Sequence, residues 1–141
     1  MLMRKKSPII LIDDDRDEGE ILEDVFAKWS IPNPLQCFYT GKEALHYLQT
    51  TTDKPFLILC DISMPEMNGI QVRKKINEDE YLRRKCIPFV FYTTSATEQA
   101  INAAYEMSVQ GFFQKGHDAA EIERLIRCIH EYWSCCRHPN D

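Results

Sequence analysis

Ile9-Ile10-Leu11-Ile12-Asp13-Asp14-Asp15 decides the fold, because an apolar run leads there directly into three consecutive acids. A short apolar run bounded by polar residues is typical of a buried strand. Carboxylates crowded at a strand end repel one another, and a hard divalent cation is the obvious counter-charge. Phe56-Leu-Ile-Leu-Cys60 runs into Asp61 in the same way. Two apolar strands that both end in acids predict one shared site.

Length and composition indicate one globular domain. The chain has 141 residues, 44% of them hydrophobic and 28% charged, with a net charge of -5. That balance argues against a nucleic-acid-binding surface, and no apolar run reaches the roughly 20 residues of a membrane span. The apolar stretch after the basic start is too short for a signal peptide. We therefore expect a cytoplasmic protein with a single domain over residues 1–141 and with no nucleic-acid or membrane partner.

The six cysteines do not indicate a disulfide framework. Four of them lie in or beside predicted strands or on the apolar stripe of the last helix: Cys37, Cys60, Cys86 and Cys128. Cys135-Cys136 lies near two histidines, but the C-x-x-C spacing of a zinc site is missing. We expect reduced cysteines that pack as small hydrophobic residues.

Strands and helices alternate along the whole chain. The predicted strands are 9–13, 35–39, 56–60, 89–92 and 111–114. The predicted helices are 16–29, 41–50, 70–78 and 97–107, with a last one capped by Asp118. Arg83-Arg84-Lys85 is expected to be a charged connector on the surface. Such alternation predicts an α/β fold, a doubly wound parallel sheet with helices on both faces.

Polar side chains follow four of these strands. They are Asp13-Asp14-Asp15, Asp61, Thr93-Thr94-Ser95 and Lys115. In open α/β sheets the ligand lies beyond the carboxyl ends of the strands, so these groups should converge. Magnesium prefers oxygen ligands, and a lysine and a hydroxyl beside it bind the remaining oxygens of a phosphoryl group. The pattern predicts a combined metal and anion site.

The chain resembles a response-regulator receiver domain of two-component signalling, of the stand-alone, chemotaxis-regulator-like class without an output domain. The matching residues are Asp13-Asp14, Asp61 with Met64-Pro65 and Gly69, Thr93, Lys115, and Gly41-Lys-Glu-Ala-Leu45 in the second helix. The resemblance covers about residues 8–132. The resemblance implies a flavodoxin-like (βα)5 fold with a five-stranded parallel sheet in the strand order 2-1-3-4-5.

The resemblance also implies a role for each site residue. Asp61 would accept the phosphoryl group, and Asp14 and Asp61 would bind Mg²⁺, or Mn²⁺ in its place, with Asp13 acting through a water. The main-chain carbonyl of Ser63 would be a further metal ligand. The residues around the phosphoryl group would be Thr93, Thr94 and Lys115, with Phe112 as the switch aromatic and Ser63 and Ser95 as tuning positions.

The implied partners are a sensor histidine kinase or phosphotransfer protein as donor and an unidentified downstream protein. Helix four, strand five and helix five would form the surface that changes on phosphorylation, and a second copy of the protein is a candidate partner there. The resemblance implies a signalling protein rather than an enzyme, with loss of its own phosphoryl group as its one reaction. Thr93-Thr94-Ser95 and Ala104-Tyr105 resemble stand-alone receivers that work with phytochrome-type kinases.

Three residues depart from the family pattern. Gly116 stands where proline usually follows the lysine, which makes a cis bond after Lys115 costly, and glycine offers unusual backbone angles instead. Phe112 has no hydroxyl for an inward hydrogen bond, and Thr94 is larger than the usual alanine. Ser95 is a candidate both for tuning water access and for the N-cap of the next helix.

Two other functions fit parts of the sequence. A haloacid-dehalogenase-type phosphatase would use Asp13 as nucleophile in a D-x-D motif, but Arg16-Asp17 replace the Gly-Thr that follows there. A receiver-like module that binds partners without phosphorylation is compatible with Thr94 and Gly116. Flavodoxin itself is disfavoured, because three acids after the first strand would repel the phosphate of FMN.

Overall fold

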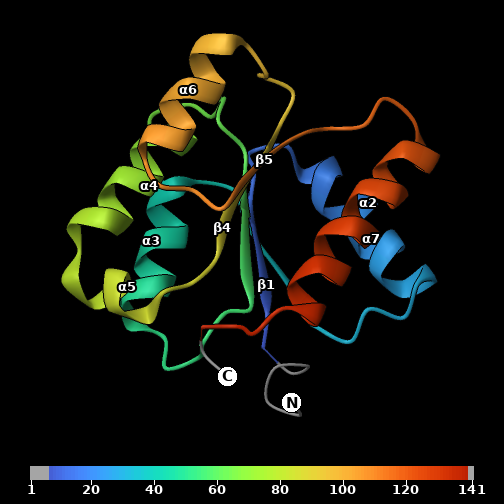
Figure 1. Cartoon of the computed structure of the whole chain (residues 1–141), viewed down its shortest axis with the longest axis horizontal. Helices are drawn as coiled ribbons and strands as arrows, with labels where there is room; N and C mark the ends of the chain where they lie inside the picture. The colour runs from blue at the N-terminus through green and yellow to red at the C-terminus, as the bar shows by residue number, and fades with distance from the viewer. Residues whose placement is uncertain (1–6, 140–141) are drawn as a thin grey trace.

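Five parallel strands form one sheet in the order β2-β1-β3-β4-β5, with helices on both faces (Figure 1). The computed structural model describes residues 7–139. The strands are β1 (Ile9–Ile12), β2 (Leu35–Phe38), β3 (Leu57–Cys60), β4 (Phe89–Thr93) and β5 (Gly111–Gln114). The helices are α2 (Arg16–Lys28), α3 (Gly41–Thr50), α4 (Gly69–Glu78), α5 (Glu80–Lys85), α6 (Glu98–Glu106) and α7 (Ala119–Cys135). This is the flavodoxin-like architecture that the resemblance to a receiver domain implies.

Two hydrophobic clusters, one on each face, hold the sheet. Successive strand residues point to opposite faces, so Ile10 and Ile12 join one cluster while Ile9 and Leu11 join the other. Helices α3, α4, α5 and α6 cover the first face, and α2 and α7 cover the second (Figure 1). Because both faces are covered, β1, β3 and β4 are buried along their whole length and read as continuous apolar runs.

Side-chain caps set where the helices begin. The Asp15 carboxylate accepts the Asp17 N–H at the start of α2. Asp118 accepts the Glu121 N–H at the start of α7, as the sequence predicts. Thr97 caps α6 instead of Ser95, because its hydroxyl accepts the Ala100 N–H. The N-cap expectation for Ser95 was therefore wrong.

Two further expectations differ from the structure. The residues described form six helices rather than five, because Arg83-Arg84-Lys85 completes the short helix α5, in which Leu82 is buried and Asp79 is the cap. Cys128 is exposed rather than on the buried stripe of α7, which runs through Ile126 and Ile129. All six cysteines are free thiols. None of the helices within residues 7–139 combines the length and apolar character that a membrane crossing requires.

Gly69 allows α4 to approach the end of β3. Its N–H donates to the Ile62 carbonyl at 2.9 Å, directly beside the strand end that carries Asp61. A Cβ atom at this position would overlap the main-chain carbonyl oxygen of Asp61 and lie 2.9 Å from the Phe91 ring. Backbone cannot yield as a flexible side chain does, so only glycine fits here.

We expect Gly69→Ala to lower the free energy of unfolding by about 1–3 kcal/mol, the usual cost of a substitution that overpacks a rigid site. Gly19→Ala on α2 is the matched control. A Cβ there lies 3.1 Å from the Sγ atom of Cys37, a side-chain atom, and the gain in helix propensity of up to ~1 kcal/mol offsets the contact. Urea denaturation measures both. Equal stability of the two variants would contradict the close approach.

Candidate functional site

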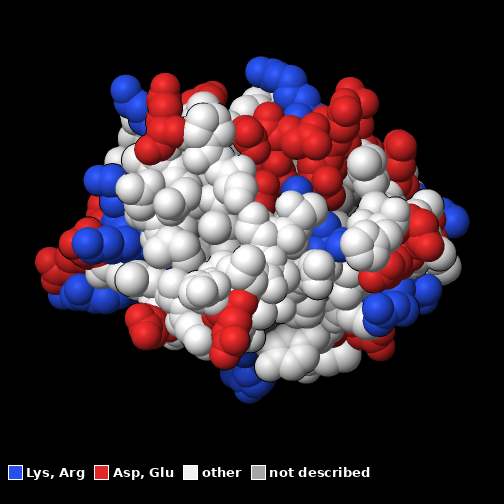
Figure 2. All heavy atoms as spheres, turned by 90° about the horizontal axis from the view of Figure 1, so that it is seen from above, with Lys and Arg blue, Asp and Glu red and all other residues white. Residues whose placement is uncertain are grey.

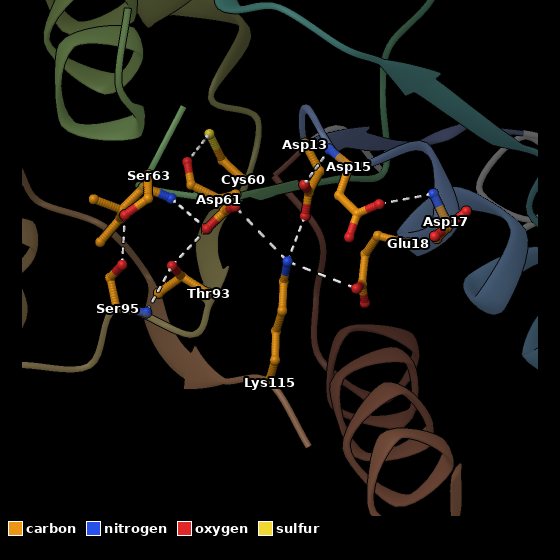
Figure 3. Close-up of polar contacts among 11 residues, drawn as sticks. Asp13, Asp15, Asp17, Glu18, Cys60, Asp61, Ser63, Thr93, Ser95 and Lys115 are labelled. Atoms are coloured by element: carbon orange, nitrogen blue, oxygen red, sulfur yellow. Dashed lines mark hydrogen bonds and ion pairs between the residues drawn. The ribbon is translucent and has the colours of Figure 1, made fainter. Parts of the chain in front are cut away.

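Four strand ends bring their polar residues together at the carboxyl edge of the sheet (Figure 3). Asp13 follows β1, Asp61 follows β3, Thr93 ends β4 and Lys115 follows β5. Main-chain hydrogen bonds continue the sheet ladder past the strands. The Asp61 N–H donates to the Ile12 carbonyl at 2.9 Å, and the Lys115 N–H donates to the Thr93 carbonyl at 2.8 Å. The backbone thus sets the spacing of these side chains.

The two carboxylate oxygens of Asp61 have different surroundings. Oδ1 accepts the Thr93 hydroxyl at 2.5 Å and the Ile62 N–H at 2.8 Å. Oδ2 makes no such bond within the described part of the chain and lies 3.7 Å from Lys115 Nζ. Asp61 is 6% exposed and Thr93 is fully buried. The carboxylate is therefore held by one oxygen while the other faces the lysine.

Lys115 is the cation at the centre of the site. Its Nζ donates to Asp13 Oδ2 at 2.6 Å and lies 3.7 Å from carboxylate oxygens of both Glu18 and Asp61. The lysine side chain is 10% exposed and that of Asp13 is 1% exposed. The other oxygen of Asp13 accepts the Asp15 N–H at 3.0 Å. Both oxygens of Asp13 are therefore engaged.

Burial and charge shift the protonation equilibria of this pair. Burial raises the pKa of Asp13 to about 6, against the lowering effect of its hydrogen bond to Lys115. Burial alone would lower the pKa of Lys115, but the hydrogen bond to Asp13 and the charges of Asp13, Asp61 and Glu18 outweigh it and raise the pKa. At neutral pH both groups are therefore charged.

The carboxylates of Asp13, Asp14 and Asp61 fit a hard divalent cation. One oxygen from each lies within 4.8 Å of the others. Asp13 and Asp61 are buried and Asp14 is exposed, so a cation could reach them from solvent. All the donors are oxygens, which suits magnesium, calcium or manganese. Lys115 neutralises one carboxylate of the three and leaves an excess of negative charge for a cation to offset.

Acidic side chains also surround the site at the surface. Figure 2 looks down on the carboxyl edge and shows them gathered in one patch beside a largely uncharged area. Asp14, Asp15 and Asp17 are exposed acids of the β1–α2 segment. Such a patch raises the local concentration of cations at the entrance.

The other predicted residues lie at the rim. The hydroxyls of Ser63 and Ser95 are hydrogen-bonded to each other at 2.5 Å and join the loops after β3 and β4. The Ser95 N–H donates to the Thr93 hydroxyl at 3.1 Å. Thr94 is exposed, and Phe112 is half-buried with its ring centroid 6.1 Å from that of Phe91.

Gly116 does not use unusual backbone angles, contrary to expectation. The described residues contain neither a cis peptide bond nor a glycine with positive φ. Instead, a Cβ at Gly116 would lie 2.8 Å from the main-chain nitrogen of Ile122 in α7. The glycine therefore matters for its small size, because it lets the chain after Lys115 pass close to α7.

With this geometry in place, the comparisons decide the family. A family model described as the response regulator receiver domain matches residues 9–127. This chain belongs to the response regulator receiver domain family. Its parallel sheet with the order β2-β1-β3-β4-β5 agrees with that membership.

Two named relatives resemble this receiver domain along most of its length. The response regulator Rcp1 of Synechocystis is 27% identical over 130 residues, which cover 89% of this chain and 87% of Rcp1. The chemotaxis protein CheY1 of Helicobacter pylori is 28% identical over 121 residues, covering 86% and 94% of the two chains.

Solved structures are similar as well. The phosphorylated cyanobacterial phytochrome response regulator RcpA superposes with a TM-score of 0.85 at 26% identity, covering 95% of this receiver domain and 99% of that chain. The Mn²⁺-bound form of Rcp1 gives a TM-score of 0.83 at 26% identity, covering 94% and 99%.

Sequence reasoning missed Glu18. It is the third residue of α2, where an acid is common because it favours the helix N-terminus. The structure buries it to 8% exposure and places its Oε2 3.7 Å from Lys115 Nζ. The sequence signal was an acid three residues after the N-cap Asp15, which is typical of a capping box and does not by itself indicate a site.

We expect repulsion among Asp13, Asp14 and Asp61 to lower the stability of the protein when no cation is bound. Removing one of the three charges should therefore stabilise the cation-free protein. Asp14→Asn should raise the melting temperature by a few degrees in EDTA and should lose most of the further rise that magnesium chloride gives the wild type. Asp15→Asn is the matched control, because it removes the same charge from the residue next to Asp14 while asparagine still caps α2. Differential scanning calorimetry measures all three proteins. An equal magnesium-dependent rise in Asp14→Asn and wild type would contradict the assignment.

Proposed function

We propose that this receiver domain accepts a phosphoryl group on Asp61 from a phosphohistidine of a sensor histidine kinase or phosphotransfer protein. The observation that carries the proposal is the asymmetry of the Asp61 carboxylate. Oδ1 is fixed by Thr93 and the Ile62 N–H, while Oδ2 accepts no hydrogen bond from the residues described and lies 3.7 Å from Lys115 Nζ. An oxygen placed in this way is free to attack phosphorus.

The transfer requires little covalent chemistry from the protein. Oδ2 of Asp61 forms the new O–P bond as the P–N bond of the phosphohistidine breaks, and the electron pair of that bond stays on the imidazole. Phosphoryl transfer is mostly positioning and charge neutralisation, so no general base is needed. Lys115 pairs with one phosphoryl oxygen, and Thr93 donates its hydroxyl to another.

Mg²⁺, for which Mn²⁺ would substitute, is the proposed cofactor. Asp14 and Asp61 would hold it directly, Asp13 through a water, and the Ser63 carbonyl would be a further ligand. When bound, the cation neutralises charge between the carboxylates and the incoming phosphoryl oxygens. The oxygen donors of Asp13, Asp14 and Asp61 within 4.8 Å of one another support this ligand set.

A phosphatase that uses Asp13 as its nucleophile is not favoured. Lys115 and the Asp15 N–H occupy both oxygens of Asp13. The match to the receiver family also covers most of the chain. Because the similar RcpA structure is described as a phytochrome response regulator, a phytochrome-type histidine kinase is the first donor to test.

We expect purified wild-type protein to incorporate one phosphoryl group from acetyl phosphate or from a candidate kinase, only in the presence of magnesium. Asp61→Asn should reduce incorporation to background, because a neutral amide is a far weaker nucleophile than a carboxylate. Asp14→Asn should slow it strongly by removing a metal ligand. Electrophoresis in gels that retard phosphoproteins measures the yield. Full labelling of Asp61→Asn would contradict the assignment.

The proposed output surface is formed by α6, β5 and α7. On phosphorylation, the Thr93 hydroxyl would donate its hydrogen bond to a phosphoryl oxygen instead of to Asp61 Oδ1, and this change would shift the end of β4. Phe112 on the neighbouring strand β5 would then repack against Phe91. Tyr105 on α6 and Tyr132 on α7 are 53% and 64% exposed, so the face offers aromatic anchors to a downstream protein or a second copy.

We expect beryllofluoride with magnesium to shift wild-type protein to a smaller elution volume in size-exclusion chromatography. Tyr105→Arg should abolish the shift, since a charge would replace an aromatic anchor. Tyr81→Arg is the control, because Tyr81 is 49% exposed but lies on α5, away from this face. Identical elution of wild type with and without beryllofluoride would count against phosphorylation-dependent self-association.

A further inference from the structure

Glu18 is buried in a place where a helix acid is usually exposed. It is the third residue after the N-cap Asp15, where a glutamate commonly reaches back to accept the N–H of the cap residue. Here the Asp15 N–H donates to Asp13 Oδ1 instead. The Glu18 side chain turns inward towards Lys115 (Figure 3). An ordinary capping role therefore does not account for its position.

The surroundings of Glu18 are unusual for a carboxylate. Its Oε1 is buried and has no hydrogen-bond partner among the described residues. The hydroxyl of the fully buried Tyr92 also lacks a hydrogen-bond partner among them. Burial raises the pKa of Tyr92, and so do the charge of Glu18 and the close approach of its side chain. Lys115 Nζ lies 5.8 Å from the centre of the Tyr92 ring. Burying a carboxylate is costly, so the interactions of Glu18 with Lys115 and with Tyr92 must offset that cost.

Lys115 has three carboxylates within reach and a much stronger contact to one of them. It is bonded to Asp13 at 2.6 Å, and Glu18 and Asp61 stand at 3.7 Å on either side. Asp13 and Asp61 belong to the cation cluster, whereas Glu18 does not. When a cation competes with the lysine for Asp13, Glu18 is the remaining carboxylate that can hold the ammonium group.

We infer that Glu18 is a positioning residue that gives Lys115 a second anchor and holds it back from the acceptor Asp61. This role rests on the proposed function, because it assumes that the site takes up a phosphoryl group. Glu18 eases cation binding by drawing the lysine off Asp13. It also opposes phosphoryl uptake, because the lysine must leave one carboxylate to reach the phosphoryl oxygens.

The affinities for Mg²⁺ and for beryllofluoride should change in opposite directions, and this difference tests the role. We expect Glu18→Gln to weaken Mg²⁺ binding and, at saturating Mg²⁺, to tighten beryllofluoride binding, each by roughly three- to tenfold for the loss of one partly buried charge pair. Glu20→Gln is the matched control, since Glu20 is exposed on the same helix and loses the same charge. Isothermal titration calorimetry measures both constants. A simple loss of structure would weaken both ligands together.

Two additional variants keep the test decisive. Glu18→Met, which suits a buried position, should change both affinities in the same directions if Glu18→Gln does not fold. In a Lys115→Gln background the effect of Glu18→Gln on Mg²⁺ affinity should shrink to that of Glu20→Gln, because no lysine remains to be held. An undiminished effect in that background would overturn the positioning role.

The outcomes also separate this inference from the proposed function. If wild-type protein takes up no beryllofluoride, the proposed function fails, while the Mg²⁺ measurements still test Glu18. If wild type binds beryllofluoride and Glu18→Gln binds it equally well or more weakly, the inference about Glu18 is wrong and the proposed function stands.

Discussion

The ion pair between Lys115 and Asp13 is the contact on which the site depends. Carboxylates crowded and partly buried at one sheet edge would otherwise leave their repulsion uncompensated. The raised pKa of Asp13, about 6, shows how much burial disfavours its charged form even with the lysine bound. Lys115 therefore acts as the resident counter-ion of this edge. In the proposed transfer the same ammonium group pairs with a phosphoryl oxygen, so the proposal requires Lys115 to leave Asp13.

The sheet explains why this crowding exists. A parallel sheet with the order β2-β1-β3-β4-β5 places β1 and β3 side by side, so the acids that follow them meet. β4 and β5 lie next along the sheet and bring the threonine hydroxyl and the lysine to the same edge. The two hydrophobic clusters hold the strands, and Gly69 allows α4 to close against the end of β3. Apolar packing thus stabilises an edge that electrostatics alone would disfavour.

The strands and the four strand-end groups could be predicted because apolar runs and their polar ends are local patterns, whereas the strand order followed from the resemblance to the receiver family. The short helix α5 could not, because six residues with one buried leucine carry no clear period. Ser95 and Thr97 are equally good caps in sequence, and only the path of the loop after β4 selects Thr97. Glu18 was missed for a similar reason. An acid in the first turn of a helix is usually explained by the helix dipole, and its burial against Lys115 depends on contacts between residues far apart in the sequence.

The most direct test of the account is to locate the phosphoryl group chemically in the unmodified protein. Protein labelled with acetyl phosphate and magnesium is treated with borohydride, which reduces an aspartyl phosphate to homoserine, and peptides are sequenced by mass spectrometry. The account predicts homoserine at position 61 and at no other aspartate. Homoserine at Asp13 would instead identify the first-strand acid as the nucleophile, and its absence throughout would contradict phosphoryl uptake by this site.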